Sequence, residues 1–92
     1  MANRDIGSTL QQAAFALNSQ RPREAERMAA EVLKIEPRDA HALRILGCAV
    51  LIQGRAAEAI APLETAARIC HDAEIDMQLA AALRQAGRAD DA

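Results

Sequence analysis

The chain has 92 residues and a formal net charge of −2, enough for one small domain. Leu, Ile, Val and Phe fill only 19 positions, whereas Ala alone fills 23, and Trp and Tyr are absent. Such a core favours closely packed helices over a sheet, so we expect an all-α domain. The 11 basic residues are scattered and offset by 13 acidic ones, which argues against a nucleic-acid-binding surface.

Neither secretion nor membrane insertion is indicated by the apolar segments. The N-terminus lacks the apolar run of a signal peptide, and the longest such stretch, Cys48 to Ile52, is too short to span a bilayer. Cys48 and Cys70 lack Cys-x-x-Cys spacing, which is typical of reduced thiols in a cytoplasm. We therefore expect a cytoplasmic protein that binds no membrane and no nucleic acid.

Turn-forming residues divide the chain into segments of about 14 residues, each with the apolar spacing of a helix. The expected helices cover 6–19, 22–35, 40–53, 56–70 and 73–86, and a sixth begins near Ala89. Apolar residues recur three and four positions apart within these segments, so each helix has one face for packing.

Individual residues support these helix ends. Asp39 is suited to cap the third helix, because its carboxylate can accept hydrogen bonds from free N–H groups. Gly54 and Gly87 can adopt the left-handed conformation that ends a helix. Pro62 falls inside the fourth helix, which predicts a kink or a locally widened turn near Glu58.

The segments also repeat along the chain. A shift of 34 residues places Glu24-Ala25 on Glu58-Ala59, Arg21 on Arg55, Ala13 on Gly47, and Ile35 on Ile69. A shift of 33 places Leu46 on Leu79 and Gly54-Arg55 on Gly87-Arg88. The repeating unit is therefore a pair of antiparallel helices joined by a short turn.

This pattern resembles the tetratricopeptide repeat family over essentially the whole chain. The second copy carries Leu46-Gly47, Gly54, Ala59 and Ala66, and the first carries Ala13, Ala25, Val32 and Pro37. The resemblance implies an all-α fold of helix-pair repeats stacked in a right-handed superhelix. The single domain would cover 1–92, with repeats at 6–39 and 40–72 and a partial repeat at 73–92.

The chain departs from the family pattern at several positions. The bulky aromatic residues usual in each helix are replaced by Thr9, Leu43, Ala16, Val50, Ala29 and Leu63. Gln20 stands where the family prefers Gly, and His71 where it usually has Pro. The small-residue contacts remain, so we expect Gly47 to face Ala59 and Ala66 in a close helix crossing.

No constellation of catalytic or metal-ligating residues is apparent. His41 and Cys48 share a helical face, but seven residues place them about 10 Å apart along the axis. The four glycines are too dispersed for a phosphate-binding loop. We expect no enzyme activity, no cofactor and no metal.

The resemblance implies a concave groove lined by the first helix of each pair, where a peptide or a partner helix docks. Carried over position by position, the lining would be Leu10, Ala14, Leu17, Asn18, His41, Arg44, Cys48, Leu51, Ile52, Glu74, Met77, Ala81, Arg84 and Gln85. Arg44 and Arg84 beside an apolar patch would suit a ligand with hydrophobic anchors and an acidic group. The alternative is that neighbouring helices already satisfy these residues.

The third unit stops at Ala92, where its second helix should begin. We therefore expect an apolar stripe without a covering helix, through which the chain self-associates: Ile75, Leu79, Leu83 and Ala86. The alternative interpretation is that the chain is a fragment of a longer protein. Family analogy then suggests an N-terminal arm of a larger bacterial enzyme, such as a sulfotransferase or glycosyltransferase.

Overall fold

The structure, a computed structural model, describes the backbone of residues 6–91 and the side chains of residues 6–87. This part of the chain is entirely α-helical and contains no strand. Its five helices are α1 (Ile6–Asn18), α2 (Pro22–Ile35), α3 (Ala40–Ile52), α4 (Ala56–Ile69) and α5 (Ala73–Asp91).

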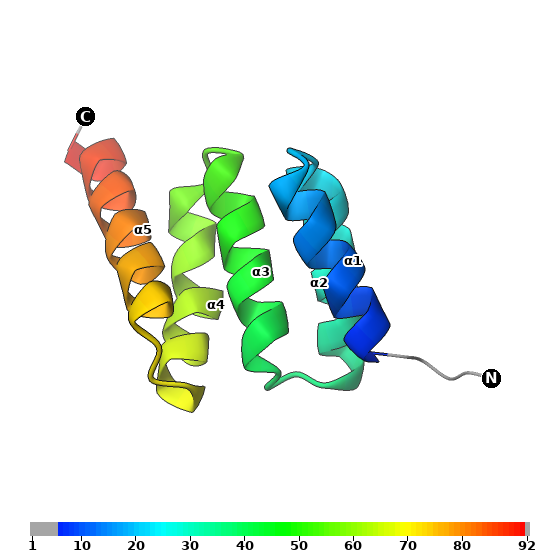
Figure 1. Cartoon of the computed structure of the whole chain (residues 1–92). Helices are drawn as coiled ribbons and strands as arrows, with labels where there is room; N and C mark the ends of the chain where they lie inside the picture. Colours follow the sequence, from blue (N-terminus) through cyan, green and yellow to red (C-terminus); the bar gives the residue numbers. More distant parts are fainter. Residues whose placement is uncertain (1–5, 92) are drawn as a thin grey trace.

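The helices form an array in which each one packs against the next along the chain. In addition, α1 packs against α3, and α3 contacts α5. Figure 1 shows α1 and α3 in front of α2 and α4, with α1 and α5 at opposite ends of the array. The odd-numbered helices therefore form one layer and the even-numbered helices a second.

The first four expected helices are confirmed to within one residue at each end. Asp39 caps α3 as expected, since its Oδ1 accepts a hydrogen bond of 3.0 Å from the N–H of Ala42. Pro22 occupies the first turn of α2, where a missing N–H costs nothing. Pro62 lies inside α4, yet the helix stays α-helical throughout, without a widened turn.

The expected end of the fifth helix at Ala86, and a sixth helix near Ala89, are wrong. α5 continues through Gly87 to Asp91. Glycine inside a helix costs only about 1 kcal/mol relative to alanine, so it ends a helix only when something else turns the chain. At Gly54 that turn is stabilised by α4, which packs back on α3.

The 34-residue repeat is visible in the backbone of the two turns. Gln20 and Gly54 are the residues with positive φ, at 62° and 83°. The next residue in each turn donates its N–H to the carbonyl five positions back, Arg21 to Ala16 at 2.8 Å and Arg55 to Val50 at 3.1 Å. Both helices thus end in the same hydrogen-bonded left-handed turn.

The buried side chains repeat in the same way. In α2 and α4 the equivalent buried residues are Ala25, Ala29 and Val32, and Ala59, Leu63 and Ala66. In α1 and α3 they are Ala13 and Ala16, and Gly47 and Val50. One set of helix-packing positions is therefore used twice, with mostly small residues that allow close approach.

Gly47 lies where α3 packs tightly against α4. A Cβ at this position would lie 2.5 Å from Cγ of Leu63, which is fully buried. The contact was expected with Ala59 and Ala66, whereas the nearest atoms belong to Leu63, which lies between them on α4. The large side chain of α4 fills the space that the missing side chain of α3 leaves.

Gly47→Ala and Gly87→Ala should have opposite effects on stability. Gly47→Ala forces Leu63 to move and should lower the free energy of unfolding by about 1–3 kcal/mol. A Cβ at Gly87 meets nothing within 4 Å, so Gly87→Ala should raise it by about 0.5–1 kcal/mol. Urea unfolding followed by circular dichroism measures both. Equal effects of the two substitutions would contradict the close packing at Gly47.

Candidate functional site

The residues expected to line a groove differ in exposure. Those that are exposed are Asn18, His41, Ile52, Glu74, Met77, Arg84 and Gln85. Those that are half-buried are Leu10, Ala14, Leu17, Arg44, Leu51 and Ala81, and Cys48 is buried. They lie on α1, α3 and α5, and α3 contacts both α1 and α5.

On α1 the apolar groove residues take part in the packing of the chain itself. Leu10, Ala14 and Leu17 pack against the core cluster to which Ile45 and Ala49 of α3 belong. Neighbouring helices therefore account for much of their apolar surface, as the alternative interpretation holds. Less apolar surface is left for a ligand on this helix than the pattern alone indicated.

Two consecutive residues at the end of α3 have different surroundings. Leu51 packs against the core cluster that contains Val50 and Leu63. Ile52 is 60% exposed, and Met77 of α5 is 68% exposed. Ile52 and Met77 are therefore the large apolar side chains that remain exposed among the expected groove residues.

The charges near the middle of this surface come from α3 and α5. Burial raises the pKa of the Cys48 thiol, Arg44 opposes this shift, and Glu74 adds to it. Both charges are thus close enough to act on the same sulfur. Cys48 is a buried thiol, whereas His41 is exposed, and no hydrogen bond joins the two among the described residues.

The stripe expected to lack a cover on α5 is largely packed within the chain. Ile75 is only 3% exposed and lies in a cluster with Leu43 and Ala66. Leu79 packs, half-buried, against the cluster around Leu63. The expectation of an uncovered stripe is therefore wrong for these two residues. Leu83, at 48% exposed, is the large apolar residue of the four that remains accessible, and Ala86 is half-buried.

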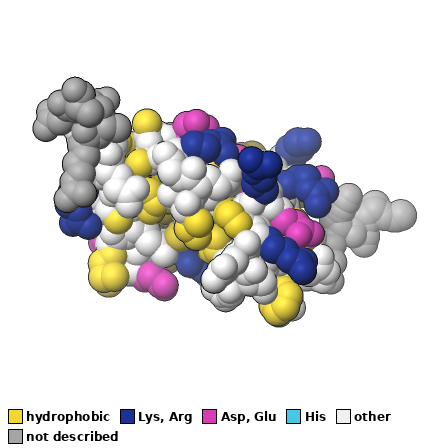
Figure 2. Space-filling model, turned by 90° about the horizontal axis from the view of Figure 1, so that it is seen from above, with side chains coloured by type: hydrophobic (Ala, Val, Ile, Leu, Met, Phe, Trp, Pro, Cys, Tyr) yellow, Lys and Arg dark blue, Asp and Glu magenta, His cyan; other side chains and the backbone are white. Residues whose placement is uncertain are grey.

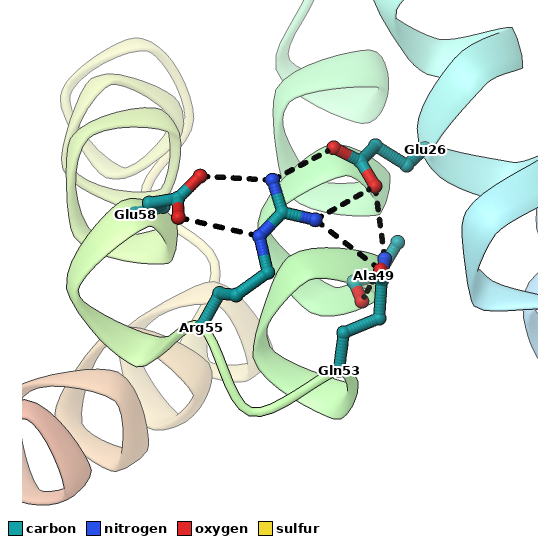
Figure 3. Close-up of polar contacts among 5 residues, drawn as sticks. All are labelled: Glu26, Ala49, Gln53, Arg55 and Glu58. Carbon is teal, nitrogen blue, oxygen red and sulfur yellow. Dashed lines mark hydrogen bonds and ion pairs between the residues drawn. The ribbon is translucent and has the colours of Figure 1, made fainter.

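A polar network at the α3–α4 turn was missed by the sequence analysis (Figure 3). Arg55 donates from Nη1 and Nη2 to the two carboxylate oxygens of Glu26, at 3.1 and 3.2 Å. It also donates from Nη2 and Nε to Glu58, at 2.8 and 3.3 Å. Gln53 donates to Glu26 at 2.9 Å. One guanidinium therefore links α2 to the start of α4.

The network stabilises the ionised carboxylates. Hydrogen bonds from Gln53 and Arg55 lower the pKa of Glu26, and the hydrogen bond from Arg55 lowers that of Glu58. The alignment of Arg21-Glu24 with Arg55-Glu58 was the available signal, and Arg21 and Glu24 do form an ion pair at 3.6 Å. Glu26 could not be found in this way, because it belongs to another helix.

Two surface depressions lie outside the expected groove. One is lined by Arg23, Glu26, Arg27, Ala30, Gln53 and Arg55. The other lies between α1 and α2 and is lined by Gln11, Gln12, Phe15, Ala16, Arg21, Glu24 and Met28. Phe15, the single aromatic residue, is 68% exposed there. Figure 2 shows basic and acidic side chains interspersed, with apolar side chains exposed between them.

The described residues can also be compared with the requirements of a metal site and of a membrane-spanning helix. No group of three or more His, Cys, Asp or Glu side chains within them could hold a metal ion. None of the helices described is both long and apolar enough to cross a membrane.

Acidification should weaken the Arg55 network. Because the pKa values of Glu26 and Glu58 lie below their ordinary value of 4.5, the stability they add is complete above that pH. It is lost as the pH falls through the lowered values. The urea midpoint of Glu26→Gln should therefore lie below that of the wild type at neutral pH, and the difference should shrink as the pH falls through the lowered pKa values.

Glu31→Gln removes one charge from an exposed position of α2 outside the network and serves as the control. A gap between wild type and Glu26→Gln that stays constant with pH would contradict the role of the ionised carboxylate.

Comparisons with known proteins do not assign the chain to a family. No family model, no curated protein and no solved structure matches it.

Proposed function

We propose that this chain is a tetratricopeptide-repeat-like module of right-handed superhelical form that binds a protein partner without catalysis of its own. The partner, a peptide or a helix, would contact the layer formed by α1, α3 and α5. The observation that carries this proposal is the exposure of Ile52 and Met77, at 60% and 68%, in that layer. The repetition of buried positions and turns at a 34-residue shift supports the family resemblance.

The chemistry of these helices suggests the kind of partner. Large exposed apolar side chains lose unfavourable contact with water when a partner covers them. Arg44 is half-buried and belongs to the same helix as Ile52, and Arg84 is exposed on α5. A segment with an apolar anchor followed by a carboxylate would therefore match Ile52 and Arg44.

Two features favour binding over catalysis. Burial raises the pKa of Cys48, so at neutral pH the thiol is protonated and a poor nucleophile. His41 is exposed, and no hydrogen bond joins it to another side chain among the described residues. The same surface therefore offers contacts for a ligand without an activated group beside them.

The test begins with a photo-reactive amino acid at Ile52 in the native host, followed by identification of the cross-linked protein and its bound segment. Arg44→Glu and Ile52→Asp should then each weaken binding of the purified segment by about tenfold or more, because each loses one desolvated contact. Isothermal titration calorimetry measures the affinities.

Glu31→Gln, on α2, should leave the affinity unchanged and is the matched surface control. Full affinity in both Arg44→Glu and Ile52→Asp would place the partner elsewhere and refute the proposed surface.

A further inference from the structure

The face of α5 that corresponds to the helix-pairing face of α1 and α3 is uncovered. Gly47 and Val50 of α3 are both buried. Gly47 lies against Leu63 of α4, and Val50 belongs to the core cluster that contains Leu63. The residues 33 positions later, Ala80 and Leu83, are exposed, Leu83 at 48%. The core face of α5, with Ile75 and Ala82, points the other way into α3 and α4. α5 therefore presents a second face that has no covering helix in the described chain.

The uncovered face of α5 has a sequence that is symmetric about Ala80. Three residues away on either side are the large apolar residues, Met77 and Leu83, and four residues away are the opposite charges, Asp76 and Arg84. Positions three, four and seven residues from a helical residue lie on its own side of the helix. These five residues are all exposed and form one stripe. Small residues, Ala73 and Gly87, continue the stripe at both ends and are exposed as well.

We propose that two copies of the chain pair through α5 in an antiparallel arrangement, with Ala80 on the two-fold axis. Met77 of each copy then packs against Leu83 of the other. Asp76 of each copy pairs with Arg84 of the other, so one interface contains two ion pairs. The inference goes beyond the proposed function, because the stripe excludes Arg44 and Ile52 of α3, although Met77 and Arg84 belong to both surfaces.

Charge decides the direction of the pairing. In a parallel pair, Asp76 would oppose Asp76, and Arg84 would oppose Arg84, which is unfavourable. The antiparallel pair brings opposite charges together at both ends of the contact. Asp76 and Arg84 are available for this, since neither has an ion-pair partner within the described chain.

Side-chain size makes the contact close enough to bury the apolar residues. Alanine on the axis lets the two backbones approach, as glycine does where α3 meets α4. Met77 and Leu83, among the most exposed apolar side chains of the chain, then lose their contact with water. Binding of a foreign helix would not require the stripe to be symmetric about Ala80. A two-fold contact with a second copy requires the stripe to be complementary to itself.

Sedimentation velocity on the 92-residue chain tests the pairing. Across concentrations from about 1 to about 500 μM, a range suited to a small interface, the mass should rise from 9.9 kDa toward twice that value. Ala80→Glu places two like charges on the axis and should leave a monomer. Ala61→Glu, a matched change at an exposed alanine of α4, should leave the dimer intact.

Charge reversal tests the antiparallel orientation of the two α5 helices, and this test uses two variants, so it does not depend on the folding of one. Asp76→Arg and Arg84→Asp should each be monomeric alone, because like charges then meet at both ends. An equimolar mixture of the two should form a heterodimer, in which all four opposing charges are complementary. Circular dichroism of each variant checks that the helices are retained.

A wild-type chain that remains at 9.9 kDa throughout, a dimer that survives Ala80→Glu, or a mixture that stays monomeric would each refute the antiparallel pairing. Because Met77 and Arg84 belong to both proposed surfaces, the two proposals are distinguished by residues that belong to only one of them. Arg44→Glu should leave the dimer intact, and Ala80→Glu should leave cross-linking at Ile52 intact.

Discussion

The close approach of α3 and α4 at Gly47 is the constraint on which the rest of the structure depends. Leu63 fills the space above the glycine and is fully buried there. The same side chain belongs to a cluster with Val50, Ala59 and Ala82, so one contact also helps to hold α5 against the pair. Since interiors are packed as densely as crystals, a core without aromatic residues needs such small-to-large matches to exclude voids. The abundance of alanine is therefore what allows these helices to lie close together.

The same position has different surroundings in the three units. Ala13 is buried beside α2, Gly47 is buried beside α4, and Ala80 is exposed. A face that is part of the core in two units thus becomes a surface in the third. The proposed pairing through α5 depends on this difference between repeated positions. Partner binding uses the side chains that α1, α3 and α5 leave free in their layer, whereas pairing uses the face of α5 that no helix covers, and Met77 belongs to both.

A second, polar constraint joins the two helix pairs. Arg55 lies in the turn that returns α3 to α4, and it holds Glu26 of the preceding pair and Glu58 of its own (Figure 3). Gln53 donates to Glu26 and to the carbonyl of Ala49, which ties the network to the end of α3. Three helices are thereby linked at one end of the array. Exposed ion pairs contribute little individually, so we assign this network to the orientation of the turn more than to overall stability.

The sequence by itself determined four of the five helices, the cap at Asp39 and the 34-residue repeat, because these depend on local spacing and on residue types at helix ends. Where the same local sequence pattern occurs twice with different structures, only the tertiary structure decided which structure each copy adopts. Gly54-Arg55 forms a turn because α4 packs back, whereas Gly87-Arg88 stays helical. Leu51 is packed against the core and Ile52 is exposed, although both are apolar and adjacent. The burial of a side chain depends on which helix lies opposite. The helical periodicity of the sequence predicts the direction of a side chain, but it does not predict which residues that side chain contacts.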